Sequence, residues 1–397
     1  MTAQTAPRAA IVTLGIDRLL STDRHLVEGR RVGLLCNPAS IDGSFRHSAD
    51  LLAGEPGVTL AAIFGPQHGF RADLQDNMIE SPHGLDARRR VPVYSLYSDV
   101  REPSPEMLEG LDALVIDIQD VGTRVYTFIY TVANCMRAAG RMQIPVIVCD
   151  RSNPINGADV EGNILDPGYA SFVGQYPIPM RHGKTVGELA GFFNRTFGLG
   201  ADLHVVTMAG WGRGLFYDET SLPWVMPSPN MPTLDAAIVY PGAVLFEGTQ
   251  LSEGRGTTRP FELIGAPWID GERLAEAMNA RGLPGVHFRP VFFEPTFQKH
   301  ARQACGGCQI HVLDREAFRP LRTSVHLIDE FHRQDPGRFA WREPPYEYEH
   351  RKMPVDILYG SDRLRDAVAA GTVAALVDGW AADEDRFRRA RQPFLLY

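Results

Sequence analysis

The 397-residue sequence has few cysteines, no long hydrophobic run and no excess of basic residues. Its five cysteines are a sparse, odd set, unlike the dense pairing of small secreted domains, so we expect reduced thiols. No stretch approaches the roughly 18–20 uncharged apolar residues of a membrane helix, and we expect no membrane partner. The net charge of −8 disfavours a nucleic-acid partner, because phosphate binding usually needs a basic face.

Motifs for common cofactors and hydrolases are missing as well. There is no GxGxxG or GxxxxGK[ST] loop for nucleotide phosphates, and neither GxSxG nor HExxH appears. The CGGC segment at 305–308 has redox or metal spacing, but it lacks a second CxxC, so we interpret it as a structural turn. We therefore expect no cofactor and no metal. The N-terminal segment has no continuous apolar region of the kind found in a leader, which predicts a cytoplasmic protein.

Glycine and proline, in contrast, are abundant. Together they make up 67 residues, about 17% of the chain where roughly 12% is average, so much of the chain must be shaped loop. The pattern of regular elements dissolves between about 211 and 267, which is Pro- and Gly-rich. A loop of that length usually builds a site or joins domains, so we predict two domains, at 1–225 and 226–397.

The first domain alternates strands with helices. Short apolar runs without polar alternation, typical of strands buried on both faces of a parallel sheet, occupy 31–36, 58–64, 91–94, 111–118 and 144–149. A helix is predicted at 126–141, and a capping box at 185–188 opens another. The sequence therefore predicts an α/β fold: a Rossmann-like parallel sheet domain, then a smaller α+β C-terminal domain, with a cleft between them.

Polar side chains follow several of these strands, where ligands collect in open parallel sheets. They form one predicted rim made of His68, Arg71, Asp120, Arg124, Asp150, Arg151, Asn153, Arg181 and His182. The inter-domain run adds Glu247, Glu253 and Arg255. Paired carboxylates at a cleft suggest glycoside hydrolysis, and clustered arginines suggest an anionic substrate group. Structural roles stay open for each: a loop hydrogen bond for His68, a helix-capping ion pair for Asp120 with Arg124, and the start of a turn for Asp150.

Motifs along nearly the whole chain resemble one family. The chain is similar to the NamZ family, formerly DUF1343, whose characterised members are exo-acting β-N-acetylmuramidases. The resembling segments are GRRVGLLCNP (29–38), FGPQHGFRADLQD (64–76), PVYSLY (92–97), VIDIQDVGTRVYTF (115–128), DRSNPING (150–157), SFVGQYPIPMRHG (171–183), PSPNMPT (227–233), YPGAVLFEGTQLSEGRGTTRPFE (240–262), GAPWID (265–270) and FLLY (394–397). The resemblance implies a Rossmann-like domain, a smaller C-terminal domain and a cleft between them. It also implies removal of terminal N-acetylmuramic acid, whose lactyl carboxylate Arg71, Arg124 and Arg255 would bind.

One position departs from the family. Its GPxHG loop commonly contains glutamate, a proposed catalytic residue, where this chain has Gln67. An amide cannot act as a general acid or base, which typically contributes 10²–10⁴-fold in rate. Three outcomes follow. Another carboxylate serves as acid (Asp73, Glu80, Asp120, Glu247 or Glu253); the substrate's acetamido group acts as internal nucleophile, positioned by Gln67 or Asp120; or the branch has changed or lost its activity.

These observations favour a glycoside hydrolase acting on a small amino-sugar substrate, a muramic-acid fragment of peptidoglycan. The catalytic candidates are Asp120, Glu247 and Glu253, with Gln67 and His68 as polar contacts. The predicted substrate-binding residues are Arg71, Arg124, Asp150, Arg151, Asn153, Arg181, His182 and Arg255. The alternatives are a non-catalytic sugar- or muropeptide-binding protein that has lost its acid, and a cytoplasmic hydrolase with another anionic substrate.

Overall fold

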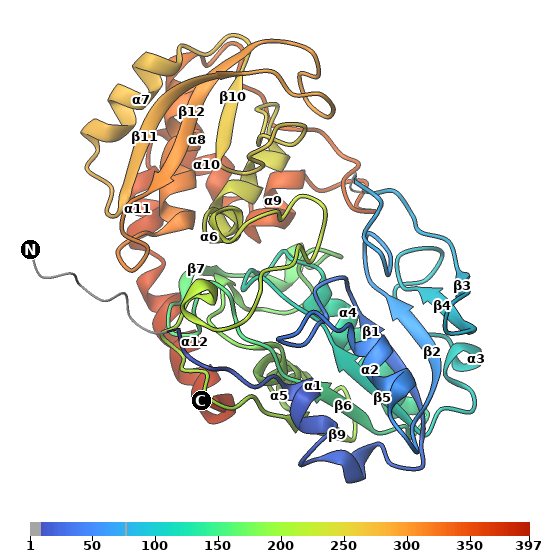
Figure 1. Cartoon of the computed structure of the whole chain (residues 1–397). Helices are drawn as coiled ribbons and strands as arrows, with labels where there is room; N and C mark the ends of the chain where they lie inside the picture. Colours follow the sequence, from blue (N-terminus) through green and yellow to red (C-terminus); the bar gives the residue numbers. More distant parts are fainter. Residues whose placement is uncertain (1–8, 76–77) are drawn as a thin grey trace, which may run out of the picture.

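A computed structural model describes residues 9–75 and 78–397. Residues 1–8, part of the N-terminal segment in which the sequence predicts no leader, lie outside the described ranges. Asp76, the last residue of the family-like segment 64–76, also lies outside them. The chain forms two units, the first below and the second above in Figure 1. Their sheets have seven and three strands, and a short two-stranded ribbon accompanies the first.

The first unit is built on the seven-stranded sheet, with the order β3-β4-β2-β1-β5-β6-β9. All neighbours are parallel except β3 and β4. The strands are β1 (Arg31–Cys36), β2 (Thr59–Gly65), β3 (Gly84–Asp86), β4 (Val91–Ser95), β5 (Ala113–Asp117), β6 (Val146–Cys149) and β9 (Leu203–Val206). The apolar runs thus form the parallel sheet that the sequence predicts, and the α/β, Rossmann-like fold is confirmed.

Helices cover both faces of this sheet. In β5, Leu114 and Ile116 belong to the hydrophobic cluster that contains α4 (Phe128–Arg141) and α5 (Val186–Phe197). Val115, pointing to the opposite face, packs with α1 (Gly15–Leu19) and α2 (Ser48–Gly54). A short α3 (Pro105–Leu108) precedes β5. The predicted capping box is present at the start of α5, where Thr185 and Glu188 each bind the other's backbone N–H. Two-sided burial explains why the central strand β5 is apolar from Ala113 to Ile116.

The second unit packs helices against a three-stranded antiparallel sheet. Its strands are β10 (Leu263–Ala266), β11 (Val286–Phe293) and β12 (Cys305–Val312), with β12 central. The helices are α6 (Leu234–Ala243), α7 (Gly271–Ala280), α8 (Pro320–Gln334), α9 (Pro354–Tyr359), α10 (Arg363–Ala370) and α11 (Val373–Asp378). The sequence pattern of 361–380 predicts a single helix, but the structure has two helices there, separated at Gly371, whose φ is +69°.

Two further predictions for this unit are wrong. The CGGC segment is not a turn but the first half of the central strand β12, because its glycines let neighbouring backbone approach: a Cβ on Gly306 or Gly307 would lie about 2 Å from a carbonyl oxygen. The 211–267 run is not wholly loop, since it contains α6, η4 (Val244–Gly248) and β10. Helix α6 contains Pro241 and Gly242, two residues that are typical of loops. Gly242 is needed there because the backbone of Pro320 in α8 passes close to it.

The last helix returns to the first unit. Helix α12 (Ala381–Arg391) packs against β7 (Glu161–Ile164) and β8 (Pro179–Arg181), and Figure 1 shows it descending beside the lower unit. Arg391 donates to the carbonyls of Gly157 and Gly183, and the Tyr397 hydroxyl donates to Asp150 at 2.8 Å. The C-terminal segment therefore ties the units together across the predicted boundary at 225–226.

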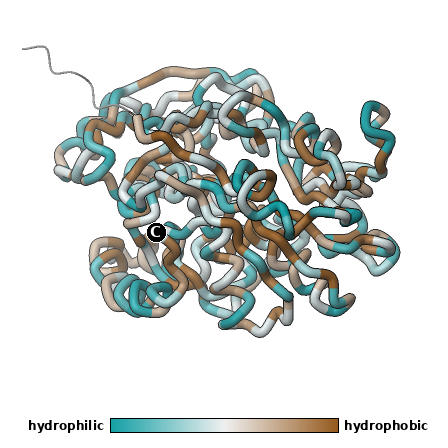
Figure 2. The backbone as a smooth tube through the Cα atoms, turned by 60° about the horizontal axis from the view of Figure 1, so that its bottom comes forward, coloured by the Kyte–Doolittle hydropathy of each residue, from teal (hydrophilic) through white to brown (hydrophobic). Residues whose placement is uncertain are grey.

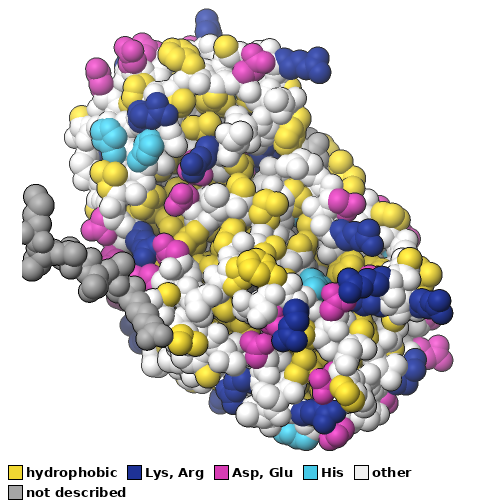
Figure 3. All heavy atoms as spheres, in the orientation of Figure 1, with side chains coloured by type: hydrophobic (Ala, Val, Ile, Leu, Met, Phe, Trp, Pro, Cys, Tyr) yellow, Lys and Arg dark blue, Asp and Glu magenta, His cyan; other side chains and the backbone are white. Residues whose placement is uncertain are grey.

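The surface and the hydropathy pattern are unremarkable. Hydrophobic and hydrophilic residues alternate over short stretches of backbone (Figure 2), and no helix within the described residues is long and apolar enough to cross a membrane. On the face shown in Figure 3, Lys and Arg are interspersed with Asp and Glu. This view fits the mixed charge of the sequence, with its small acidic excess.

Candidate active site

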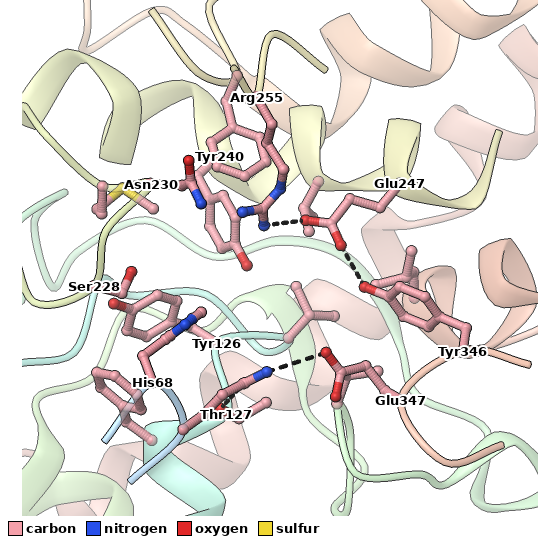
Figure 4. A pocket seen from close by; sticks show the side chains of 18 residues that line it. His68, Tyr126, Thr127, Ser228, Asn230, Tyr240, Glu247, Arg255, Tyr346 and Glu347 are labelled. Carbon is pink, nitrogen blue, oxygen red and sulfur yellow. Dashed lines mark hydrogen bonds and ion pairs between the residues drawn. The ribbon is translucent and has the colours of Figure 1, made fainter. Parts of the chain in front are cut away.

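A pocket lies where the loops after β2 and β5 meet the second unit. Its polar lining combines residues from both units: Gln67, His68, Tyr126, Thr127, Ser228, Asn230, Tyr240, Glu247, Arg255, Tyr346 and Glu347 (Figure 4). Apolar side chains, among them Val173, Met231 and Phe261, complete the wall. The mixed lining suits a small ligand with one apolar and one polar side.

The loop after β2 brings Gln67 and His68 into the pocket. His68 and Gly69 both have positive φ, +70° and +81°, and the non-glycine residue stores about 1–3 kcal/mol of strain there. The His68 Nδ1 donates to the Leu74 carbonyl at 2.8 Å, which fixes the ring. The Gln67 amide is also fixed: its oxygen accepts from Thr127 at 2.8 Å and its nitrogen donates to Glu347 at 3.1 Å.

Glu347, which the sequence analysis missed, comes from a tight hairpin of the second unit. Tyr346 and Glu349 exchange both backbone hydrogen bonds at 2.9 Å across the turn residues Glu347 and Tyr348. The side chain of Glu347 accepts from the Tyr97 hydroxyl at 2.7 Å and from Gln67, and the residue is 2% exposed. The Pro-Pro pair at 344–345 indicates a shaped loop here, but nothing local shows that the loop reaches the first unit.

Glu247 approaches the pocket from η4, opposite Glu347 in Figure 4. Its two oxygens accept from Arg255 at 2.7 Å and from the Tyr346 hydroxyl at 2.5 Å. Glu253 lies 3.4 Å from the Arg255 Nε and is itself bound by Lys299 at 2.7 Å. The arrangement is a buried, alternating chain of charges with Glu247 at its pocket end.

The two pocket carboxyls have pKa values shifted in opposite directions. Burial raises the pKa of Glu247, but the charge and hydrogen bond of Arg255 outweigh burial and hold it below its ordinary value. Burial also raises the pKa of Glu347, the charge of Glu247 raises it further, and the hydrogen bonds from Tyr97 and Gln67 only partly oppose this. Two carboxyls in one pocket whose environments push their pKa values apart are the arrangement that acid–base chemistry uses.

Comparison with known proteins assigns the chain to a family. The profiles described as "Exo-beta-N-acetylmuramidase NamZ", N-terminal and C-terminal, match residues 32–235 and 238–397. The chain belongs to the NamZ family. The resemblance that the sequence motifs indicated is thereby confirmed.

Individual relatives in the NamZ family match over almost the full length. The chain is 45% identical over 395 residues to "Peptidoglycan beta-N-acetylmuramidase NamZ" of Bacillus subtilis (strain 168), which covers 99% of this chain and 93% of that protein. A crystal structure of a DUF1343 family protein from Bacteroides fragilis NCTC 9343 is 34% identical, with a TM-score of 0.88 and coverage of 98% and 100% of the two chains. A second protein from the same organism is 29% identical with a TM-score of 0.77, covering 97% and 99%.

Three of the five predicted catalytic residues line the pocket of this NamZ-family chain: Gln67, His68 and Glu247. The other two are placed beside it. Asp120 accepts from the Gly122 N–H at 2.7 Å and faces His182 Nε2 at 3.6 Å. Glu253 holds Arg255 and Lys299 and supports the pocket from behind.

The structure does not bring the three predicted anion-binding arginines together in the pocket. Of the eight predicted substrate-binding residues, Arg255 is the one that lines the pocket among the described residues. Arg71 is exposed on the loop after β2. Arg124 is fully buried and donates to four carbonyls, those of Asn163, Ile178, Leu358 and Tyr359. Because its donors are used to join the two units, the geometry gives Arg124 a structural role instead of the predicted clamp.

The remaining predicted residues gather at the carboxyl ends of β5 and β6, as expected, but bind neighbouring protein groups there. Arg151 forms a bidentate ion pair with Asp117 at 2.5 and 2.8 Å. Asp150 accepts from Thr185, the Gly187 N–H and Tyr397, which ties it to the start of α5. Asn153 and Arg181 bind neighbouring backbone carbonyls, and His182 Nδ1 accepts from the Lys184 N–H. The geometry therefore favours the structural alternatives at these positions.

The described residues offer little for a cation. Within 9–75 and 78–397, no group of three or more His, Cys, Asp and Glu side chains is placed to hold a metal ion. The pocket carboxylates are instead bound by Arg255 and by phenol and amide donors. The chemistry that this pocket supports is proton transfer and charge stabilisation by side chains.

Proposed function

We propose that this chain is a glycoside hydrolase that removes terminal N-acetylmuramic acid, or a closely related amino sugar, from peptidoglycan fragments. The observation that carries the proposal is the ionised Glu247, fixed by Arg255 and Tyr346 in a pocket formed by both family-matched halves. The identity with a peptidoglycan β-N-acetylmuramidase extends over both halves. The family relation supplies the substrate class, and the pocket supplies a reason for glycosidic chemistry.

In this proposal Glu247 stabilises the positive charge that develops at the anomeric carbon. Cleavage of a glycosidic bond passes through an oxocarbenium-like transition state. A carboxylate already held by a guanidinium and a phenol needs no reorganisation as that charge appears.

Recognition of the sugar is then shared between polar and apolar walls. Gln67, His68 and Asn230 present hydrogen-bonding groups, and Met231 and Val173 can pack against methyl groups of the acetamido or lactyl substituents. Of the arginines predicted for the lactyl carboxylate, Arg255 reaches the pocket, and it is already paired with Glu247. Neutral donors therefore contribute a large part of lactyl recognition.

The alternative is a sugar-binding protein without turnover, and Gln67 is the observation that favours it. An amide at this position cannot transfer a proton.

The predicted cytoplasmic location also belongs to the proposal: a cytoplasmic enzyme would meet imported fragments, whereas peptidoglycan itself lies outside the membrane.

The test is hydrolysis of 4-nitrophenyl β-N-acetylmuraminide, with the matching N-acetylglucosaminide as comparison. We expect the wild-type protein to release nitrophenolate from the muraminide and Glu247→Gln to lose roughly 10²–10³-fold in kcat. Glu276→Gln, on the exposed face of α7, is the matched control and should behave as wild type. Saturable binding of the muraminide with no release above buffer would instead establish the binding protein.

A further inference from the structure

We propose that Glu347 is the general acid of this pocket and that Tyr97 is its positioning residue. The assignment rests on the proposed glycosidase function and names the group that delivers the proton. Glu347 belongs to the second unit, yet its carboxyl lies between two side chains of the first unit, Gln67 and Tyr97, at 3.1 and 2.7 Å. Figure 4 shows this carboxyl at the floor of the pocket, across from Glu247.

The backbone that carries Glu347 is strained. Glu347 and Tyr348 have φ of +46° and +66°, in a two-residue hairpin turn for which Asn-Gly is the favoured sequence. Left-handed conformations of non-glycine residues cost about 1–3 kcal/mol each and persist where surrounding contacts determine them. Here those contacts are the side chains of Glu347 and Tyr348 themselves, so the strain is tied to the placement of this carboxyl.

Tyr97 is held rigidly enough to position the acid. The Arg101 guanidinium lies 4.3 Å from the ring centroids of both Tyr97 and Tyr348, whose rings meet edge to face. Tyr348 donates to Glu80 at 3.2 Å, and Glu80 pairs with Arg101 at 3.6 Å. This stacked group joins the hairpin to the first unit and fixes the phenol that donates to Glu347.

Two of the other pocket side chains are unsuited to deliver a proton. Gln67 is an amide, and Glu247 is bound by a guanidinium and remains ionised. The side chains that donate hydrogen bonds to Glu347 are neutral, a phenol and an amide, so its carboxyl retains a proton more readily than Glu247.

The reaction balances with these two carboxyls and one water. The Glu347 carboxyl proton passes to the glycosidic oxygen while the C1–O bond breaks, and the bonding electron pair leaves with that oxygen as a neutral alcohol. Glu247 stabilises the positive centre at C1. Water then bonds to C1 through its oxygen, and the proton it releases returns to the Glu347 carboxylate.

The first test compares leaving groups in Glu347→Gln. A poor leaving group needs the acid and a good one does not, so we expect hydrolysis of a disaccharide with terminal β-N-acetylmuramic acid to fall 10²–10⁴-fold and that of 2,4-dinitrophenyl β-N-acetylmuraminide to fall less than about tenfold. Glu343→Gln, exposed in the same loop, should hydrolyse both as wild type does. Equal loss on both substrates, or no loss on either, overturns the assignment alone. A wild-type protein inactive on both substrates would overturn the proposed function as well.

The second test uses Tyr97→Phe, which keeps the acid and removes one hydrogen bond. The charged groups facing Glu347 are Glu247, which raises its pKa, and Arg255, which lowers it, and both remain in this variant. The lost Tyr97 bond favours the ionised form, so the pKa of Glu347 should rise and the alkaline limb of kcat/KM should move up by roughly half to one pH unit. Tyr94→Phe, on neighbouring β4, is the control. A lower kcat with an unmoved profile would show a merely structural role and overturn the positioning assignment.

Discussion

Two buried polar clusters lie beyond the carboxyl ends of the parallel strands and differ in how their charges are satisfied. In the Arg151 cluster, formed by Asp117, Asp150, Arg151 and Thr185, each charged group meets a partner of opposite sign or the start of a helix. In the junction pocket, the pocket between the two units, Glu247 is ion-paired, whereas Glu347 accepts hydrogen bonds from a phenol and an amide. The comparison teaches that chemistry is retained where a buried acid faces neutral donors and a cavity, and not merely where polar residues converge.

The largest expected effect comes from breaking the Arg151 cluster. Arg151→Met leaves Asp117 buried and without its guanidinium, and both side chains are at most 1% exposed. Removing one partner of a buried ion pair typically costs about 3–5 kcal/mol. We expect urea denaturation to show a loss of this size while the kcat of the protein that remains folded is unchanged. Unchanged stability with a large loss of kcat would show that the Arg151 cluster takes part in catalysis and does not only stabilise the fold.

The second prediction concerns Asp150 and the pH dependence of stability. Burial raises the pKa of Asp150 to about 6, from an ordinary value of 3.8. Because the folded state holds this proton more tightly, the group contributes most below pH 4, and the contribution falls by about 3 kcal/mol as pH rises through 6. In Asp150→Asn the amide nitrogen can donate to Thr185 and Tyr397, whose hydroxyls rotate to accept.

Asp150→Asn should therefore lose that pH dependence. Free energies of unfolding measured from pH 4 to pH 8 are expected to shift in favour of the variant, relative to wild type, as the pH rises. A constant difference between the two proteins across this range would contradict the raised pKa. Asp202→Asn, an exposed aspartate beside β9, is the control.

The sequence predicts the strands and helices around the Arg151 cluster far better than the segments that form the junction pocket. The strands and the Thr185–Glu188 capping box depend on local pattern, so they were predicted closely. The Gly-Gly strand in β12 and the Pro-containing α6 were missed, because close backbone approach to a distant segment decides their structure. Glu347 was missed for the same reason: its partner Gln67 is 280 positions away in the sequence.

A third, smaller effect is expected from adding a charge to the junction pocket. Gln67→Glu would place a second carboxyl within hydrogen-bond distance of Glu347, and such a pair shares a proton with a raised apparent pKa. We expect the alkaline limb of kcat/KM to move up by about one pH unit or more, with Gln303→Glu, in an exposed loop, as control. Activity that appears only in Gln67→Glu, and is absent from wild type, would support the lost-acid alternative.

The smallest effect should come from Arg71, the predicted clamp that lies outside the pocket. Its side chain is on the exposed loop after β2, where solvent and salt screen a charge, and it is not among the residues that line the cavity. Arg71→Ala should therefore change KM for the muraminide less than about twofold, and should leave the preference for muraminide over N-acetylglucosaminide unchanged. Arg255→Met, which unpairs Glu247 inside the pocket, should lower kcat instead. If Arg71→Ala alone abolished the preference for the lactyl-bearing sugar, recognition of the substrate would extend from the pocket onto the exposed loop after β2.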